Sequence, residues 1–182
     1  MSRLDIDEFY LFIAYGYARR ATCLRHKVGC VIVDTTNRTI SSGYNGAPSG
    51  LPHCLDIGCI RDKKKIPSGE KQEYCWGVHA EQNALIQAED RDKLIGATLY
   101  CTHTPCLMCL KMILNAKIAR VVHGGRYPVT DLALDLINGA GISFEEYGQG
   151  LTKQEIEEAL KKGKREADEW LANHPTLPGY YR

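Results

Sequence analysis

The sequence predicts an α/β domain of three layers, in which helices cover both faces of a mixed sheet. Residues 28–34 and 38–44 are rich in β-branched side chains and are joined by a three-residue turn, as in an antiparallel hairpin. After this hairpin, stretches of strand character alternate with stretches of helical periodicity, which is typical of strands that run parallel. At 182 residues the chain fits one domain, residues 1–182.

The first predicted element is a helix over residues 5–22. Its apolar residues recur at helical spacing and would form one buried stripe: Ile6, Phe9, Tyr10, Ile13 and Tyr17. Asp5 and Glu8 would cap its first turn. The two hairpin strands follow, and glycines and a proline within 43–50 then end regular structure.

Residues 46–78 form a long stretch without clear periodicity. Loops of this length in compact domains are usually functional, disordered or held by an additional constraint. Cys54, Cys59 and Cys75 lie within it and could provide that constraint by binding a metal.

The remaining elements continue the alternation of helix and strand. A helix over 78–89 and a strand over 97–102 come first, and Thr104 would then cap a helix that has Pro105 at its first position. The core-facing side chains of that helix would be apolar: Leu110, Ile113 and Leu114.

The last predicted elements are two strands and two helices. A strand over 118–123 precedes a helix over 129–138, and the final strand covers 142–147. The inward side chains of the 129–138 helix would be Leu132, Leu136 and Ile137. Thr152 and Glu155 form a capping box that opens an additional C-terminal helix to about residue 172, and the tail 174–182 should be extended.

Composition indicates a soluble, cytoplasmic protein. The formal net charge of +1 gives no global field that favours DNA, RNA or an anionic membrane. The N-terminal residues lack the apolar core of a signal peptide, and no apolar run has the length of a membrane span. We therefore expect the eight cysteines to be reduced or bound to metal. Cys30 and Cys101 lie in predicted strands and should be small buried hydrophobic residues.

One histidine, one glutamate and two cysteines have the spacing of a catalytic zinc site. His79, Cys106 and Cys109 make three ligands and leave the fourth position to water, whereas a structural zinc usually has four protein ligands. Glu81 could move protons between that water and a substrate. Because His79 and Glu81 are two residues apart, they can share a site only if the end of their helix faces the metal.

Cys106 and Cys109 also have the spacing of a redox motif or a structural zinc clip. A predicted helix start favours thiolates at these positions, because unpaired backbone N–H groups point there. The histidine and glutamate upstream, and the proline before Cys106, favour the catalytic site over both alternatives.

The segments His79-Ala80-Glu81 and Pro105–Cys109 match the pattern H-x-E…P-C-x-x-C of zinc deaminases. Together with residues 28–33, 43–50 and 121–122, they make the chain resemble the zinc-dependent cytidine/deoxycytidylate deaminase superfamily over nearly its whole length, and most closely its deoxycytidylate (dCMP) deaminases. The resemblance implies a cytidine-deaminase-like α/β/α fold with a central mixed five-stranded sheet. It also implies zinc-dependent hydrolysis of dCMP to dUMP and ammonia, which feeds thymidylate synthesis.

The resemblance further implies roles for single residues. Glu81 would protonate N3 of the cytosine and then the departing ammonia, Asn45 would bind the deoxyribose, and the backbone at Ala80 would contact the pyrimidine. Arg126 and Tyr127 follow the fourth strand, where many relatives have a tyrosine, and are expected substrate contacts. Turn chemistry between two glycines also accounts for Asn45, and Arg25 and Lys27 are further candidates to bind the phosphate.

A second, structural zinc is expected at four other cysteines. Cys23, at the end of the first helix, and Cys54, Cys59 and Cys75 in the long loop could close a coordination sphere beside the active helix, with His53 as a substitute for one of them. The alternative is that these thiols bind no metal or form a disulfide.

Two other functions share the zinc motif. One is a deaminase of tRNA adenosine or of another nucleic acid, although such enzymes usually need a basic surface. The other is a non-catalytic, zinc-stabilised assembly module, which would not need Glu81. The resemblance also implies a homo-oligomer, commonly a hexamer, and allosteric regulation by dCTP and dTTP.

Overall fold

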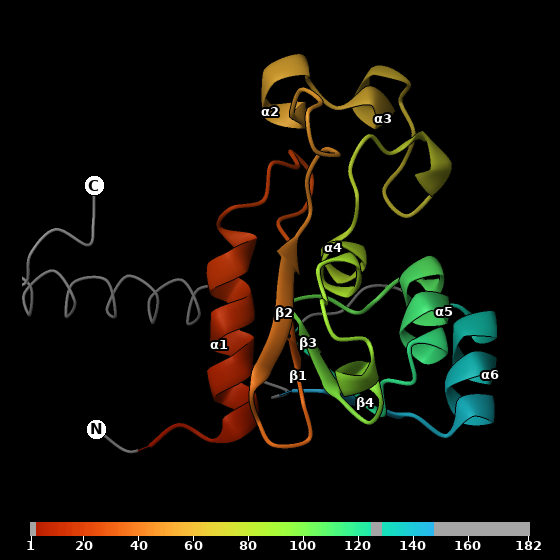
Figure 1. The fold of residues 1–182 in the computed structure, drawn as a ribbon. Coiled ribbons are helices and arrows are strands. Elements are labelled where there is room, and N and C mark those ends of the chain that lie inside the picture. Colours follow the sequence, from red (N-terminus) through yellow and green to blue (C-terminus); the bar gives the residue numbers. More distant parts are fainter. Residues whose placement is uncertain (1–2, 125–128, 148–182) are drawn as a thin grey trace, which may run out of the picture. The chain divides into compact units, whose positions relative to one another are not determined.

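The computed structural model describes residues 3–124 and 129–147 (Figure 1). The chain divides into two compact units, Met1–Gln149 and Gly150–Arg182, and every described residue belongs to the first. The predicted helix over 152–172, the predicted tail, Arg126 and Tyr127 lie outside the described residues and stay predictions.

A five-stranded mixed sheet forms the centre of the first unit. Its strands are β1 (Gly29–Val33), β2 (Thr39–Tyr44), β3 (Thr98–Cys101), β4 (Arg120–His123) and β5 (Ser143–Glu146). They lie in the order β2-β1-β3-β4-β5. β1 is antiparallel to both β2 and β3, whereas β4 is parallel to both β3 and β5. The predicted fold, with its hairpin and partly parallel sheet, is confirmed.

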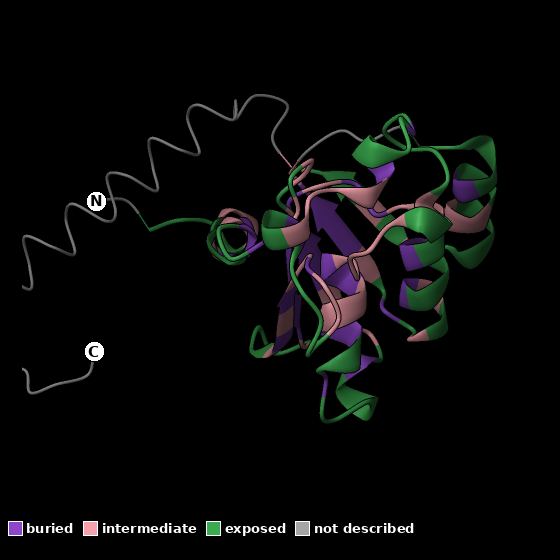
Figure 2. Cartoon of the chain, turned by 90° about the horizontal axis from the view of Figure 1, so that it is seen from above, coloured by how far each residue is buried: buried purple, intermediate pink, exposed green. Residues whose placement is uncertain are grey.

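Helices cover both faces of the sheet (Figures 1 and 2). α1 (Ile6–Ala18) lies on one face, and α4 (Ala80–Ile86) and α5 (Leu107–Asn115) lie on the other, with α6 (Asp131–Ala140) beside α5. Successive strand residues point to opposite faces: Val31 packs in the cluster under α1, whereas Cys30 and Ile32 pack in the cluster under α4 and α5. Cys30 and Cys101 are fully buried, as predicted.

The predicted buried face of the first helix is right only in part. Tyr10 is buried and Ile13 packs against the core, as predicted, whereas Ile6, Phe9 and Tyr17 are exposed. The other buried residues of the helix are Leu11, Ala14 and Ala18. Helix and sheet approach so closely that a Cβ on Gly29 would lie 1.9 Å from the Ala14 carbonyl oxygen. Ala14 and Ala18 fit this contact, whereas large side chains would not. The helix also ends at Ala18, and the Asp5 carboxylate alone caps its start by accepting from the backbone N–H groups of Asp7 and Glu8.

The long loop contains regular structure that the sequence pattern did not predict. It includes two single-turn helices, α2 (Cys54–Ile57) and α3 (Ile60–Lys63), and the 3₁₀ turn η1 (Gln72–Tyr74). A second 3₁₀ turn, η2 (Asp92–Leu94), follows α4. Elements this short carry too few residues to show a hydrophobic period. A β-bridge between Gly46 and Val78 joins the two ends of the loop.

Two further details differ from the predictions. Cys106, not Thr104, is the N-cap of α5, because the Thr104 hydroxyl lies 3.3 Å from Nδ1 of His123 instead. In α6, Ala133 is buried and Leu132 is 51% exposed, since only a small residue faces the neighbouring helix there. Leu110 and Ile113 of α5 are buried, as predicted.

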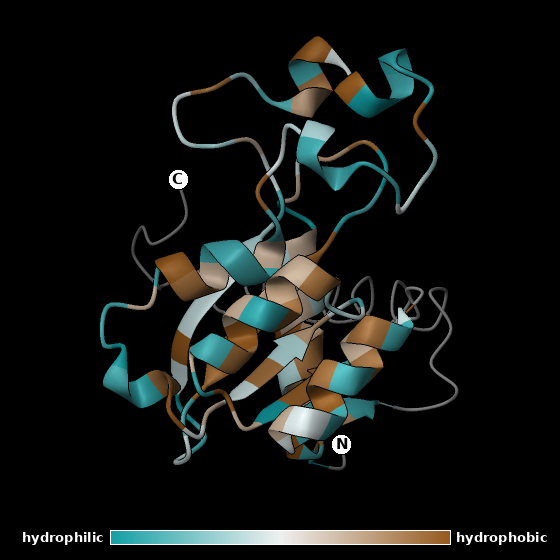
Figure 3. Cartoon of the chain, turned by 90° about the vertical axis from the view of Figure 1, so that its right-hand side faces the viewer, coloured by the Kyte–Doolittle hydropathy of each residue, from teal (hydrophilic) through white to brown (hydrophobic). Residues whose placement is uncertain are grey.

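Several large apolar side chains lie on the outer surfaces of the helices. On α4, α5 and α6 they are Ile86, Met108, Met112, Leu132 and Leu134. Figure 3 shows hydrophobic and hydrophilic segments interspersed on these helices. None of the described helices is long and apolar enough to cross a membrane.

Gly43 allows α4 to pack closely on β2, and its replacement should destabilise the unit. A Cβ at this position would lie 2.3 Å from the Ala80 carbonyl oxygen and 2.6 Å from the Ala84 nitrogen, which are backbone atoms that cannot rotate away. We expect Gly43→Ala to lower the free energy of unfolding by about 1–3 kcal/mol, measured by urea denaturation. Gly16→Ala is the matched control, because its Cβ meets no atom within 4 Å and should be neutral or stabilising in a helix. Equal stability of Gly43→Ala and the wild type would contradict this account.

Candidate active site

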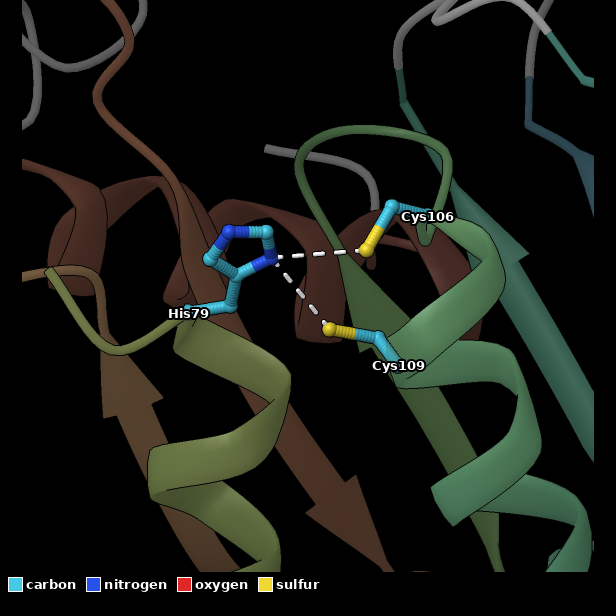
Figure 4. A group of neighbouring side chains, drawn as sticks. All are labelled: His79, Cys106 and Cys109. Carbon is cyan, nitrogen blue, oxygen red and sulfur yellow. Dashed lines mark hydrogen bonds between the residues drawn. The ribbon is translucent and has the colours of Figure 1, made fainter. Parts of the chain in front are cut away.

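The N-termini of two helices meet at the centre of the candidate site (Figure 4). His79 is the N-cap of α4, where its backbone N–H donates to the Gln82 side chain at 2.9 Å. Cys106 is the N-cap of α5, and Cys109 lies one turn further along. The condition that the end of the His79 helix should face the metal is therefore met.

The three predicted ligands have the geometry of a zinc site. Nδ1 of His79 lies 3.5 Å from Sγ of Cys106 and 3.4 Å from Sγ of Cys109. Tetrahedral zinc, with its usual Zn–N and Zn–S bond lengths, would separate a nitrogen from a sulfur by about 3.6 Å. All three ligand atoms lie within 4.8 Å of one another, and no other set of this kind occurs among the described residues. The donors fit zinc almost without movement.

The protonation of the two thiols also favours a cation. A hydrogen bond with Cys109 lowers the pKa of Cys106 to about 4; burial opposes this effect, and a hydrogen bond with His79 adds to it. The same hydrogen bond, together with burial, raises the pKa of Cys109. Cys106 therefore loses its proton readily, whereas Cys109 keeps its proton. Two adjacent buried thiolates would repel each other unless a positive charge compensated them. A bound dication supplies that charge and displaces the second proton.

Glu81 lies in the first turn of α4 and is only 4% exposed. Burial raises the pKa of its carboxyl group, although the neighbouring His79 opposes this effect. A carboxyl group with a raised pKa can both accept and donate a proton, as general acid–base catalysis requires. The structure therefore places a buried carboxyl group at the same helix end as His79.

A cavity of about 100 Å³ opens at this site. A single water needs only about 10–15 Å³ on the same measure, so the cavity has room for a small organic ligand. His79, Glu81 and Cys106 line it from the helix starts, and Asn45 and Ala80 line it as well. Asn45, His79, Ala80, Glu81 and Cys106, which the sequence predicts for one site, therefore lie around one cavity.

Asn45 uses its side chain to shape the wall of the cavity. Its Oδ1 accepts from the Val28 backbone N–H at 2.8 Å, and its Nδ2 donates to the His26 carbonyl oxygen at 2.8 Å. These contacts agree with the interpretation of Asn45 as a turn residue. An amide can make up to four hydrogen bonds, so one donor and one acceptor site are left beyond these two contacts.

The predicted cations differ in their surroundings. Arg25 lines the cavity, but its guanidinium pairs with Asp62 at 2.6 Å and donates to backbone carbonyl groups of Ile66 and Pro67. Lys27 is exposed and does not line the cavity. The structure adds Arg61, which sequence reasoning missed; it is 8% exposed and lines the cavity from α3. Arg61 stands next to a lysine-rich run, and no sequence signal distinguishes it from those solvated neighbours.

The four cysteines predicted to hold a second zinc line the same cavity: Cys23, Cys54, Cys59 and Cys75. Burial raises the pKa of Cys54, and the other three thiols raise it further, so the four lie near one another. Among the described residues, however, their sulfur atoms do not form a group of three or more within 4.8 Å. The structure gathers the four thiols around one cavity without bringing them to coordinating distance.

Comparison with known proteins identifies a family match across the site. Residues 4–125 match the model of the cytidine and deoxycytidylate deaminase zinc-binding region. A deoxycytidylate deaminase of Mycobacterium phage D29 is 44% identical over 128 residues, which cover 68% of this chain and 97% of the phage protein. A crystal structure of the dCMP deaminase from the cyanophage S-TIM5, in complex with dCMP and dUMP, aligns with a TM-score of 0.63 and 30% identity over 80% of this chain and 99% of that chain.

A deoxycytidylate deaminase of Schizosaccharomyces pombe is 35% identical over 141 residues, or 78% of this chain. The match spans only 44% of that longer protein.

The geometry of the ligands generates a test by metal content. We expect Cys109→Ser and His79→Ala to lose about one zinc per chain relative to the wild type, because two remaining donors bind zinc far more weakly than three. Zinc would be measured by mass spectrometry after gel filtration. Cys30→Ala is the matched control, because it removes a buried thiol that contributes no ligand atom to the group. Unchanged zinc in Cys109→Ser would refute the assignment.

Proposed function

Since the chain belongs to the cytidine and deoxycytidylate deaminase family, we propose that it hydrolyses dCMP to dUMP and ammonia and so feeds thymidylate synthesis. The observation that carries the proposal is the buried Glu81 beside the three-donor site in a ligand-sized cavity. The similarity to proteins named deoxycytidylate deaminase supports dCMP as the substrate. The neighbouring crystal structure with dCMP and dUMP supports it further.

His79, Cys106 and Cys109 would hold the zinc. Zinc in such a site supplies an acidified water as the nucleophile. Glu81 would accept one proton of that water and donate it to N3 of the pyrimidine. It would then accept the remaining proton from the oxygen now bonded to C4 and deliver it to the amine, which leaves as ammonia when the C4–N bond breaks. Its burial suits this role, because a carboxyl group that is costly to ionise returns a proton readily.

The remaining substrate contacts follow the sequence prediction. Asn45 would bind the deoxyribose with the hydrogen-bonding capacity that its local contacts leave. The backbone at Ala80, fully buried at the cavity wall, would contact the pyrimidine. Arg126 and Tyr127 stay predicted substrate contacts.

The two alternative functions have less support. A deaminase of tRNA or another nucleic acid would be expected to carry a basic surface, and the formal net charge is only +1. A non-catalytic assembly module would have no need for a buried carboxyl group beside the metal ligands, since burying an ionisable group is costly.

A second, structural zinc would be held by Cys23, Cys54, Cys59 and Cys75, with His53 as an alternative ligand. Their position around one cavity supports this, because a small movement of the single-turn helices could close the distances. A metal there would tie the long loop to the segment that follows α1, which contains Cys23.

Assembly, regulation and location complete the proposal. The chain would form a homo-oligomer, and the large apolar side chains exposed on the helices, including Phe9, Ile86 and Met108, support this assembly. The hexamer itself rests on the family resemblance. Regulation by dCTP and dTTP and a cytoplasmic location rest on the family resemblance.

The proton-transfer role predicts a loss of activity without a loss of metal. We expect Glu81→Gln to reduce kcat for dCMP by about 10²–10⁴-fold, because the amide can neither accept nor return the proton, while zinc content is kept. Ammonia release would be followed with dCMP, dCTP, deoxycytidine and an adenosine-containing tRNA stem-loop. Glu89→Gln, at an exposed position, should behave as the wild type. Wild-type turnover of another substrate but not of dCMP would refute the substrate assignment.

The second zinc predicts a separate change in metal content. We expect about two zinc ions per wild-type chain and about one in Cys75→Ser, with a melting temperature lower by roughly 5 °C or more as the loop loses its constraint. Cys101→Ala is the control, because it removes a buried core thiol outside the four-cysteine group. One zinc per wild-type chain, with Cys75→Ser as stable as the wild type, would exclude the second site.

A further inference from the structure

The cavity contains two arginines, and their charges are balanced differently. Arg25 and Arg61 both line it. Arg25 forms an ion pair with Asp62 at 2.6 Å, and each of its guanidinium nitrogens donates a hydrogen bond to Asp62, Ile66 or Pro67. Its charge and its donors are therefore already used within the protein.

Arg61 has no such balance. The described residues place no carboxylate within ion-pair distance of it; their salt bridges involve Arg25, Lys93 and Arg120. It is nevertheless only 8% exposed. A buried cation without a counter-ion is costly, and such charges in proteins are normally paired. The position therefore favours a bound anion that the described residues do not themselves supply.

The hydrogen bonds of Arg61 hold its side chain and leave donors unused. Nη2 donates to the carbonyl oxygens of Pro67 at 2.7 Å and of Glu70 at 2.6 Å. Nε is buried and has no partner among the described residues. Of the five N–H donors of a guanidinium, these two bonds use two. The three donors on Nε and Nη1 have no acceptor among the described residues, although the side chain is already held in place by its two bonds.

The charge of Arg61 acts on a histidine that lines the cavity. Burial lowers the pKa of His26, and the positive charges of Arg25 and Arg61 lower it further. Both arginines therefore act on His26 at the cavity, but among the described residues only Arg25 is paired with a carboxylate.

We propose that Arg61 is the specificity residue that binds the 5′-phosphate of the nucleotide substrate. A phosphate monoester provides both missing features, since it carries negative charge and several acceptor oxygens that match a guanidinium. The inference rests on the proposed deamination of dCMP. It assigns the preference for a nucleotide over a nucleoside to Arg61 of the long loop. Arg126 and Tyr127, which follow the fourth strand, would not determine this preference.

The test compares dCMP with deoxycytidine, which lacks the phosphate. We expect Arg61→Gln to lower kcat/KM for dCMP by about 10- to 100-fold, while kcat/KM for deoxycytidine stays within about threefold of the wild type. A purely structural role would lower both values together. Arg61→Lys should recover part of the preference for dCMP, because it restores the charge without the fork of donors.

Two matched arginine variants control for charge and for the loop. Arg91→Gln removes a cation at an exposed position outside the cavity and should leave the ratio of the two kcat/KM values unchanged. Arg25→Gln should lower the melting temperature through loss of the Asp62 pair and keep the ratio. An unchanged ratio in Arg61→Gln, or a ratio that collapses in Arg25→Gln instead, overturns the proposal.

The outcomes separate this inference from the proposed function. A wild type that deaminates neither compound rejects the deaminase assignment, and the role of Arg61 with it. Turnover of dCMP by the wild type, with an unchanged ratio in Arg61→Gln, rejects the role of Arg61 alone.

If the variants of Arg61 do not fold, a measurement on the wild type can test whether Arg61 binds the phosphate. The Nε–H resonance of Arg61 in ¹⁵N-labelled protein would be followed during titration with the product dUMP and with deoxyuridine. We expect a saturable shift with dUMP and none with deoxyuridine, because only dUMP carries the phosphate. The absence of a shift at saturating dUMP overturns the proposal.

Discussion

The site depends on the convergence of two helix N-termini, those of α4 and α5. Because His79 and Cys106 are N-cap residues, their side chains project beyond the helix ends toward one another, and the Nδ1–Sγ distances become 3.4–3.5 Å. The unpaired backbone N–H groups at a helix start also stabilise negative charge. The same arrangement therefore provides both the geometry of the donors and the electrostatic environment for thiolates.

The sheet and its glycines hold the two helix ends in place. α5 follows directly after β3, so the position of Cys106 is set by a buried central strand. α4 reaches its position only because β2 presents Gly43 to its backbone. Close packing of this kind leaves little freedom to adjust, since protein interiors are as dense as organic crystals. Two distant segments of the chain thus meet with the accuracy that a metal needs.

The long loop contributes to the chemistry of the cavity as well as to its shape. It supplies Arg61, Trp76 and three cysteines to the cavity wall, and Arg61 in turn holds the loop through the carbonyl groups of Pro67 and Glu70. The cavity therefore has a metal-binding end formed by rigid helix starts and an outer wall formed by the loop. Such a division suits a reaction in which one end transforms the base while the other recognises the rest of the ligand.

The sequence by itself determined the order of the main elements and the mixed sheet, and it predicted the three donors that the structure brings together, because hydrophobic period and ligand spacing are local properties of the chain. It did not predict the buried face of α1, the exposure of Leu132 or the cap at Cys106, since each depends on what packs opposite. Only the tertiary structure distinguished Arg61, which is buried and has no counter-ion among the described residues, from the paired Arg25. Charge balance in a cavity is a property of residues brought together by folding, and no local pattern encodes it.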